Sequence, residues 1–242
     1  RFRADCRIGQ VINRLGETAT PLRLIVFDCD GTLVDSQHAI VTTMTAAFAE
    51  VDLPPPGANA IRALIGLSLE ETMARLWPHG SAAESAVLIA VYRRLFSEQR
   101  SRGAVPDQLF PHAGTVLRQL DAAGYLLGVA TGKSRRGLDA VLVSHNLQKI
   151  FLTRQTADGH PGKPHPSMLL QAMAEAGVEA GDTLMLGDTS FDMAMAVNAG
   201  VTPVGVAWGN HDEDILYEAG ARMVLEDFRD LLPCVNEQWP VL

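Results

Sequence analysis

The chain has 242 residues, of which 47% are hydrophobic and 20% are charged, a composition typical of a soluble globular protein. Acidic residues outnumber Lys and Arg by 28 to 20, and no stretch gathers enough positive charge to follow a phosphate backbone, so nucleic acid is not an expected partner. No apolar run approaches the roughly 20 residues needed to cross a bilayer, so a membrane is not expected either.

The three cysteines, Cys6, Cys29 and Cys234, lie far apart in the sequence. Their spacing fits neither a disulfide framework nor a thiolate zinc site, and the cytoplasm is therefore the expected location. Residues 1–20 lack the apolar core of a secretory signal, and we interpret them as an N-terminal extension.

Beyond this extension, short apolar runs typical of buried strands alternate with segments of helical periodicity. Such alternation predicts an α/β fold with a doubly wound parallel sheet and helices on both faces. The expected strands are 22–27, 125–131, 183–187, 201–207 and, as a weaker pattern, 221–225. The expected helices that accompany them are 113–123, 134–145, 166–177 and 191–199.

A stretch without any expected strand interrupts the alternation after the first strand. It contains only helical segments, at 39–51, 61–67, 69–76 and 82–100, with a Pro-Pro-Pro-Gly turn between the first two. We therefore predict a small, separate all-helical domain at 37–102. The remainder, 21–36 and 103–242, is predicted to form a Rossmann-like core domain.

Polar side chains follow several of the predicted strands or lie in the loops beside them, at the sheet edge where ligands bind in folds of this kind. They are Asp28, Asp30, Thr131, Lys163, Asp188 and Asp192. Carboxylates brought this close together repel one another unless a cation lies among them. Mg²⁺ prefers one or two carboxylates, several waters and a substrate phosphate oxygen, so it is the expected cofactor.

Asp28 and Asp30 cannot be equivalent, because Gly31 lets the chain turn directly after them. One carboxylate could attack phosphorus as a nucleophile, while the other could donate a proton to the leaving oxygen and later accept one from water. Thr131, Lys163, backbone N–H groups and the metal are suited to neutralise the phosphoryl oxygens. This pattern predicts phosphoryl transfer from a small-molecule phosphate ester.

Taken in order, these residues resemble the four motifs of the haloacid dehalogenase superfamily of phosphohydrolases. The match comprises Asp28-Cys29-Asp30-Gly31-Thr32, then Thr131, then Lys163, then Gly187-Asp188 with Asp192. The predicted helical insert resembles the small helical cap of that superfamily, and the nearest subgroup by appearance is the phosphoglycolate phosphatases.

The resemblance implies a role for each carboxylate. Asp28 would be the nucleophile and a metal ligand, and Asp30 the acid and base, with its main-chain carbonyl also on the metal. Asp188 would bind Mg²⁺ directly, while Asp192 would support the metal through water or hold Lys163. Because members named for dehalogenation lack the second aspartate, Asp30 favours phosphate over halide chemistry.

Other residues are implied to bind the phosphoryl group or the rest of the substrate: Gly31, Thr32, Thr131, Gly132, Lys163 and, from the cap, Arg62. Each also has a plainer interpretation when taken alone. Thr131 could cap the next helix, Lys163 could be a solvated lysine, and Arg62 could be a surface arginine. Gly132 stands where many phosphoglycolate phosphatases carry Asn, which leaves the substrate open.

The leading hypothesis is therefore a Mg²⁺-dependent phosphatase that hydrolyses a small phosphate monoester, such as phosphoglycolate or a sugar phosphate, through an aspartyl phosphate. A sugar phosphomutase of the β-phosphoglucomutase type and a non-catalytic phosphate-binding module stay open as alternatives. A calcium-binding loop is disfavoured. Such a loop has its glycine at the sixth position, whereas Gly31 is at the fourth position when Asp28 is counted as the first. The sequence does not define the oligomeric state, and a monomer or weak dimer is the working assumption.

Overall fold

The computed structural model describes residues 22–103 and 108–239, so the predicted extension at 1–20 lies outside the described residues. Its centre is a six-stranded parallel sheet with the order β5-β4-β1-β6-β7-β8. The strands are β1 Leu24–Phe27, β4 Leu126–Thr131, β5 Phe151–Thr156, β6 Thr183–Gly187, β7 Thr202–Val206 and β8 Met223–Leu225.

The middle of this sheet is where the chain changes direction. It runs from β1 outward through β4 to β5 on one side, then crosses to β6 and continues outward on the other side. Loops that leave β1, β4 and β6 at this switch point diverge and open a crevice beyond the carboxyl ends of the strands. The predicted site residues lie at this crevice.

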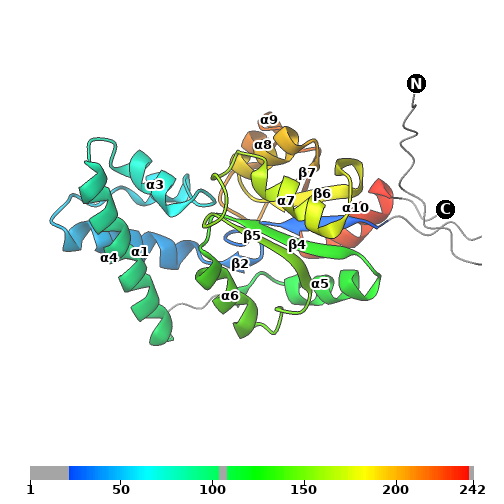
Figure 1. Ribbon diagram of the computed structural model, residues 1–242, viewed down its shortest axis with the longest axis horizontal. Helices are drawn as coiled ribbons and strands as arrows, with labels where there is room; N and C mark the ends of the chain where they lie inside the picture. The colour runs from blue at the N-terminus through cyan, green and yellow to red at the C-terminus, as the bar shows by residue number, and fades with distance from the viewer. Residues whose placement is uncertain (1–21, 104–107, 240–242) are drawn as a thin grey trace, which may run out of the picture.

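Helices cover both faces of the sheet (Figure 1). Ile25 and Phe27 of β1 point to one face, where they pack in a cluster with α5 (Ala113–Ala122), α6 (Arg135–Ser144) and α10 (Leu231–Gln238). Leu24 and Val26 point to the other face and pack against α7 (Ser167–Ala176) and α8 (Ser190–Ala199). The predicted doubly wound α/β fold is confirmed.

Three core elements were not among the expected ones. Strand β5 has only two apolar residues, at its start, and its buried positions include Thr153 and Gln155, so it lacks the apolar run by which the other strands were recognised. The short helix α9 (Glu213–Glu218) buries only Leu216, and α10 follows the last predicted strand. Two 3-10 turns, Ala180–Asp182 and Phe228–Asp230, complete this part.

Four helices between β1 and α5 pack around a hydrophobic cluster of their own, formed by Met44, Ala47, Phe48, Ile61, Met73 and Leu88. They are α1 (Gln37–Glu50), α2 (Ala58–Arg62), α3 (Leu69–Leu76) and α4 (Ala82–Ser101). Figure 1 shows this group as a separate lobe beside the sheet. The predicted helix at 61–67 is displaced to 58–62, and Gly66 in the loop that follows has a left-handed φ of 100°.

The chain passes from the core to this helical group and back through a two-stranded antiparallel ribbon. Its strands are β2 (Val34–Asp35) and β3 (Gln108–Leu109). The exact division of the chain at 37–102 stays a prediction, and we call these residues the cap below. Among the described residues, no helix is both long and apolar enough to cross a membrane.

Candidate active site

Asp28 lies at the carboxyl end of the central strand, where the backbone N–H donates to the carbonyl of Leu186 in β6 at 2.9 Å. Its side chain has no solvent exposure. Lys163 reaches it from the loop before α7, with Nζ 2.7 Å from Oδ1 of Asp28. Lys163 is only 3% exposed, so the plain interpretation of a solvated surface lysine does not hold.

The same lysine also pairs with Asp192, whose Oδ1 lies 2.6 Å from Nζ. The other oxygen of Asp192, Oδ2, accepts hydrogen bonds from the backbone N–H and the hydroxyl of Thr189, at 3.1 and 2.7 Å. Thr189 is the N-cap of α8, and the two residues form a reciprocal capping box. Asp192 therefore stabilises the start of its helix and holds Lys163 at the same time.

Asp188 is the third buried carboxylate of the group. Its Oδ1 accepts from the hydroxyl of Thr32 at 2.9 Å, and its Oδ2 accepts from the backbone and side-chain amides of Asn210 at 2.9 and 2.7 Å. Gln37, the first residue of α1, donates in turn to the side-chain oxygen of Asn210 at 2.9 Å. Asp188 is thus oriented by three donors, one of which is linked to the cap.

The electrostatics of this group are set by burial. Desolvation raises the pKa of Asp28 well above its ordinary value, although the Lys163 charge works in the opposite direction. Desolvation and then the charge of Asp192 raise the pKa of Asp188 to about 6, against the lowering effect of its hydrogen bonds from Asn210. Burial opposes the charge on Lys163, but Asp192 and Asp28 outweigh it and raise the pKa of the lysine, which stays protonated.

The donor set suits a hard divalent cation. Asp28, Asp188 and Asp192 each offer an oxygen, and these oxygens lie within 4.8 Å of one another. Lys163 neutralises only one of the three charges when all are ionised. Within residues 22–103 and 108–239, Oδ2 of Asp28 is buried and accepts no hydrogen bond. A buried, unsatisfied carboxylate oxygen is costly, and a bound cation would satisfy it.

The side chain of Asp30 points away from this cluster, as the turn at Gly31 predicted. Its Oδ1 lies 2.6 Å from Nζ of Lys133 and also accepts from the hydroxyl of Ser36, the N-cap residue of α1. Gly31 adopts a left-handed φ of 86°, and a Cβ there would lie 2.1 Å from Oδ2 of Asp188. No side chain larger than hydrogen fits in that turn.

Thr131 is buried at the end of β4, and its hydroxyl accepts from the backbone N–H of Lys133 at 3.3 Å. It does not cap the next helix, because Ser134 does so by accepting from the N–H of Gly137. Thr131, Lys163 and Asp28 are thus all buried at the carboxyl edge of the central strands, whereas Thr32 contacts Asp188.

Of the two remaining predicted substrate-binding residues, Gly132 lies at the contact between cap and core, whereas Arg62 lies outside the cavity. A Cβ on Gly132 would lie 2.4 Å from the carbonyl oxygen of Leu67, so the backbone of the cap rests directly on this glycine. Arg62 donates to the side chain of its neighbour Asn59 at 3.0 Å and is not among the residues that line the cavity between cap and core. The structure therefore does not bring Arg62 together with the carboxylates.

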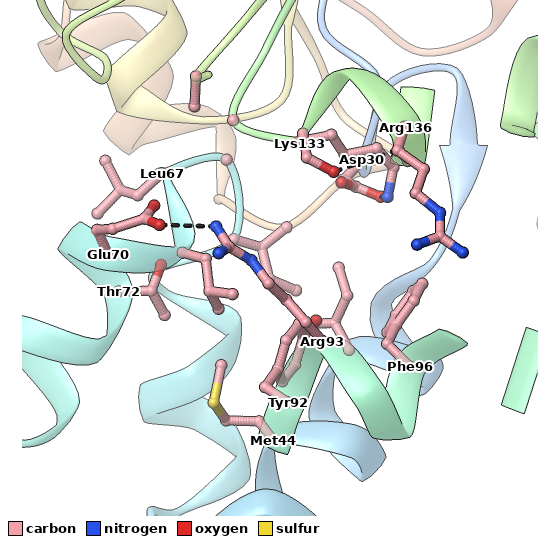
Figure 2. A pocket seen from close by; sticks show the side chains of 18 of the residues that line it. Asp30, Met44, Leu67, Glu70, Thr72, Tyr92, Arg93, Phe96, Lys133 and Arg136 are labelled. Carbon is pink, nitrogen blue, oxygen red and sulfur yellow. Dashed lines mark hydrogen bonds and ion pairs between the residues drawn. The ribbon is translucent and has the colours of Figure 1, made fainter. Parts of the chain in front are cut away.

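A cavity of about 500 Å³ lies between the cap and the core. Figure 2 shows Asp30 and Lys133 side by side on one side of it and the Glu70–Arg93 pair on the other. Asp28 is not part of the cavity wall, and its side chain has no solvent exposure in this conformation.

Several residues of the site were not assigned a role from the sequence. Asn210 contacts Asp188 partly through its backbone N–H, a group that every residue except proline carries, so the residue type gave no signal. Lys133 and Ser36 flank Thr131 and the Asp28 loop, but only the fold shows that both contact Asp30. Thr189 could have been found, because a threonine three residues before an acidic residue is a capping-box pattern.

Comparison with known proteins identifies the family to which the chain belongs. The family model of the haloacid dehalogenase-like hydrolases matches residues 25–206, and the chain therefore belongs to that family. The probable phosphatase IndB of Dickeya dadantii (strain 3937) is 37% identical over 213 residues, which cover 86% of this chain and 91% of that protein.

Two further similarities agree with this assignment. Phosphoglycolate phosphatase 1 of Pseudomonas aeruginosa is 31% identical over 221 residues, 89% of this chain and 80% of that protein. The crystal structure of a hydrolase from Pseudomonas syringae superposes with a TM-score of 0.80 at 26% identity, and the match covers 89% of this chain and 98% of that one. The family resemblance inferred from the sequence motifs is confirmed, and the chain is an enzyme of the hydrolase class.

Proposed function

We propose that the protein is a Mg²⁺-dependent phosphatase that hydrolyses a small phosphate monoester through an aspartyl phosphate on Asp28. The observation that carries this proposal is the buried ion pair of Asp28 with Lys163, beside two further carboxylates. Both relatives described above bear the name phosphatase, which supports the same reaction class.

In the first step, a carboxylate oxygen of Asp28 attacks phosphorus, and the bond from phosphorus to the ester oxygen breaks. Asp30 gives its proton to that leaving oxygen, so the alcohol departs neutral. Lys163 holds Asp28 in position, and the Lys163 ammonium together with the Thr131 hydroxyl balances charge on the phosphoryl oxygens.

In the second step, Asp30 accepts a proton from a water molecule, whose oxygen attacks phosphorus. The bond between phosphorus and the Asp28 oxygen breaks, phosphate leaves, and both carboxyl groups return to their starting forms. Because the Asp28 side chain has no exposure in this conformation, substrate enters when the cap moves away, and the closed cap keeps bulk water from the first step.

Asp28 and Asp188 would hold the Mg²⁺ ion, with the main-chain carbonyl of Asp30 as a further proposed ligand and Asp192 as support. Bound Mg²⁺ supplies positive charge that the phosphoryl oxygens require. Asn210 and Thr32 keep Asp188 oriented toward the group.

The experiment that tests this proposal measures phosphate release from p-nitrophenyl phosphate, phosphoglycolate, sugar phosphates and nucleotides, with Mg²⁺ and with a chelator. We expect Mg²⁺-dependent release, trapping of ³²P on the wild-type chain, and neither with Asp28→Asn. Release that persists in Asp28→Asn would contradict the proposal. Turnover of a sugar phosphate to its isomer, only with a sugar bisphosphate present, would identify the mutase instead.

A further inference from the structure

The cavity between cap and core has mainly apolar walls. Tyr92 and Phe96, one turn apart on α4, stack with ring centroids 5.7 Å apart, and both line the cavity. Aliphatic side chains from α1, from α3 and from the loop between α2 and α3 complete the apolar wall, among them Ile40, Met44, Leu64, Ile65, Leu67 and Leu69. Such walls bind carbon-rich groups by removing apolar surface from water.

Most of the charged groups in the wall have partners within the protein. Lys133 pairs with Asp30 at 2.6 Å, and Arg93 pairs with Glu70 at 2.7 Å in the half-exposed rim. Arg100 lies over the ring of Phe96 at 5.8 Å. Four of the charged lining side chains are basic and three are acidic, so the wall carries a small positive excess: Arg93, Arg100, Lys133 and Arg136 against Asp30, Glu70 and Asp158.

The position of Asp30 relates this cavity to the reaction. In the proposed function, Asp30 protonates the oxygen that leaves phosphorus, and Asp30 is the one carboxylate of the Asp28-to-Asp30 loop that lines the cavity. Whatever is bonded to the leaving oxygen must therefore extend from Asp30 into the cavity, past Phe96 and Tyr92 (Figure 2).

We propose that the substrate is a phosphate monoester whose leaving group is predominantly apolar and much larger than a glycolate. This inference rests on the proposed function and names the substrate class of the same site. The volume of about 500 Å³ falls in the range of roughly 300–1,000 Å³ that holds drug-sized ligands. A glycolate leaving group would fill little of it and would leave most of the aromatic and aliphatic wall uncovered.

The test compares ethyl, butyl and hexyl phosphate, which differ in size while their alcohols differ little in acidity, with phosphoglycolate and p-nitrophenyl phosphate as references. We expect kcat/KM to rise roughly three- to fourfold for each added methylene, on the order of a hundredfold from ethyl to hexyl phosphate. Equal or faster turnover of ethyl phosphate or phosphoglycolate would overturn the inference and leave the phosphatase intact. Absence of release from every ester, p-nitrophenyl phosphate included, would overturn the proposed function itself.

Variants of the cavity wall test whether the cavity causes the preference for longer alkyl phosphates. Ala140→Phe fills part of the space from α6 and is expected to lower the ratio of kcat/KM for hexyl over ethyl phosphate by roughly tenfold. Phe96→Ala removes an apolar wall and is expected to lower the same ratio. Ala174→Phe, the same change on the exposed face of α7, is the matched control and should keep the wild-type ratio. An unchanged ratio in both cavity variants would overturn the inference.

Discussion

Asn210 donates two hydrogen bonds to one oxygen of Asp188, from its backbone N–H at 2.9 Å and from its side-chain amide at 2.7 Å. The amide keeps this orientation because Gln37 of the cap donates to its oxygen. Partners of a metal-binding carboxylate that fix its orientation contribute to metal affinity as well as to order. If Asp188 binds Mg²⁺ as proposed, Asn210 would therefore tune the affinity for the ion through this carboxylate.

Asn210→Ala is accordingly expected to raise the Mg²⁺ concentration for half-maximal activity by about 10–100-fold. At saturating Mg²⁺ most of the kcat should return, since the residue acts through Asp188. A Mg²⁺ titration of phosphate release measures the shift, with Asn236→Ala on the exposed side of α10 as control. A loss of kcat that added Mg²⁺ does not restore would contradict a role in metal affinity.

Removal of the Lys163 charge should destabilise the fold as well as the activity. In Lys163→Met, the buried carboxylates of Asp28 and Asp192 lose their ion-pair partner. We expect the free energy of unfolding to fall by about 3–5 kcal/mol in chelator at pH 8, measured with urea. Adding Asp28→Asn to this variant removes one uncompensated charge, so the double variant should be more stable than Lys163→Met. The reverse order would argue against charge burial as the cause.

Stabilisation by Mg²⁺ should depend on pH. The folded, metal-free protein has a pKa of about 6 at Asp188, above the ordinary value, and a raised pKa at Asp28. A raised carboxyl pKa means that the folded state holds the proton more tightly, so this contribution to stability is complete below about pH 4 and is lost as the pH rises through 6. Mg²⁺ would bind the ionised carboxylates. The stabilisation of the folded state by Mg²⁺ should therefore be larger at higher pH.

We expect the rise in Tm on addition of Mg²⁺ to be small at pH 5 and to grow to a plateau near pH 8. Differential scanning fluorimetry with Mg²⁺ or chelator at each pH checks this, and Asp188→Asn provides the variant that should lose most of the dependence. A Mg²⁺ effect equally large at pH 5 would show that protons do not compete for these carboxylates.

The contact between Gly132 and the cap makes a further prediction. A Cβ at this position would approach the carbonyl oxygens of Leu67 and Gly66 at 2.4 and 2.7 Å, distances that neither backbone can accommodate without moving. Gly132→Ala and Gly132→Asn should hold the cap away from the core, expose the aspartates and lower kcat/KM by roughly tenfold or more. Gly159→Ala is the control, since a Cβ there meets no atom within 4 Å. Wild-type kinetics in both variants would mean that the cap does not close to this contact during turnover.

The sequence predicted the part of the site that residue type and strand position define. Asp28, Asp188 and Lys163 could be placed because apolar runs mark the buried strands and because their loops meet at one edge of a parallel sheet. For Asp192 the sequence left two roles open, support of the metal through water or contact with Lys163. The structure shows the contact with Lys163. Whether Asp192 also supports a metal through water stays a prediction.

What the sequence could not predict depends on contacts across long sequence distances. The buried side chains of Thr153 and Gln155 in β5 are satisfied by Glu175 of α7, so that strand is hidden from any test based on apolar runs. Likewise, the walls of the cavity come from five helices and several loops. Helical periodicity alone does not distinguish a side chain that faces the cavity from one that faces the cap's own core. The proposed substrate class therefore depends on the packed structure and not on the sequence pattern.

The two-stranded ribbon that joins the cap to the core has a mechanical consequence. Val34, in β2, accepts a hydrogen bond from the N–H of Gly31, and Ser36 at the end of the ribbon donates its hydroxyl to Asp30. The pivot for any cap movement would thus lie only a few residues from Asp30, the proposed proton donor. A swing that admits substrate would also pull Ser36 away from Asp30, so that the acid is set in place only when the cap returns. The cap could then not be open to substrate while Asp30 is held in position for proton transfer.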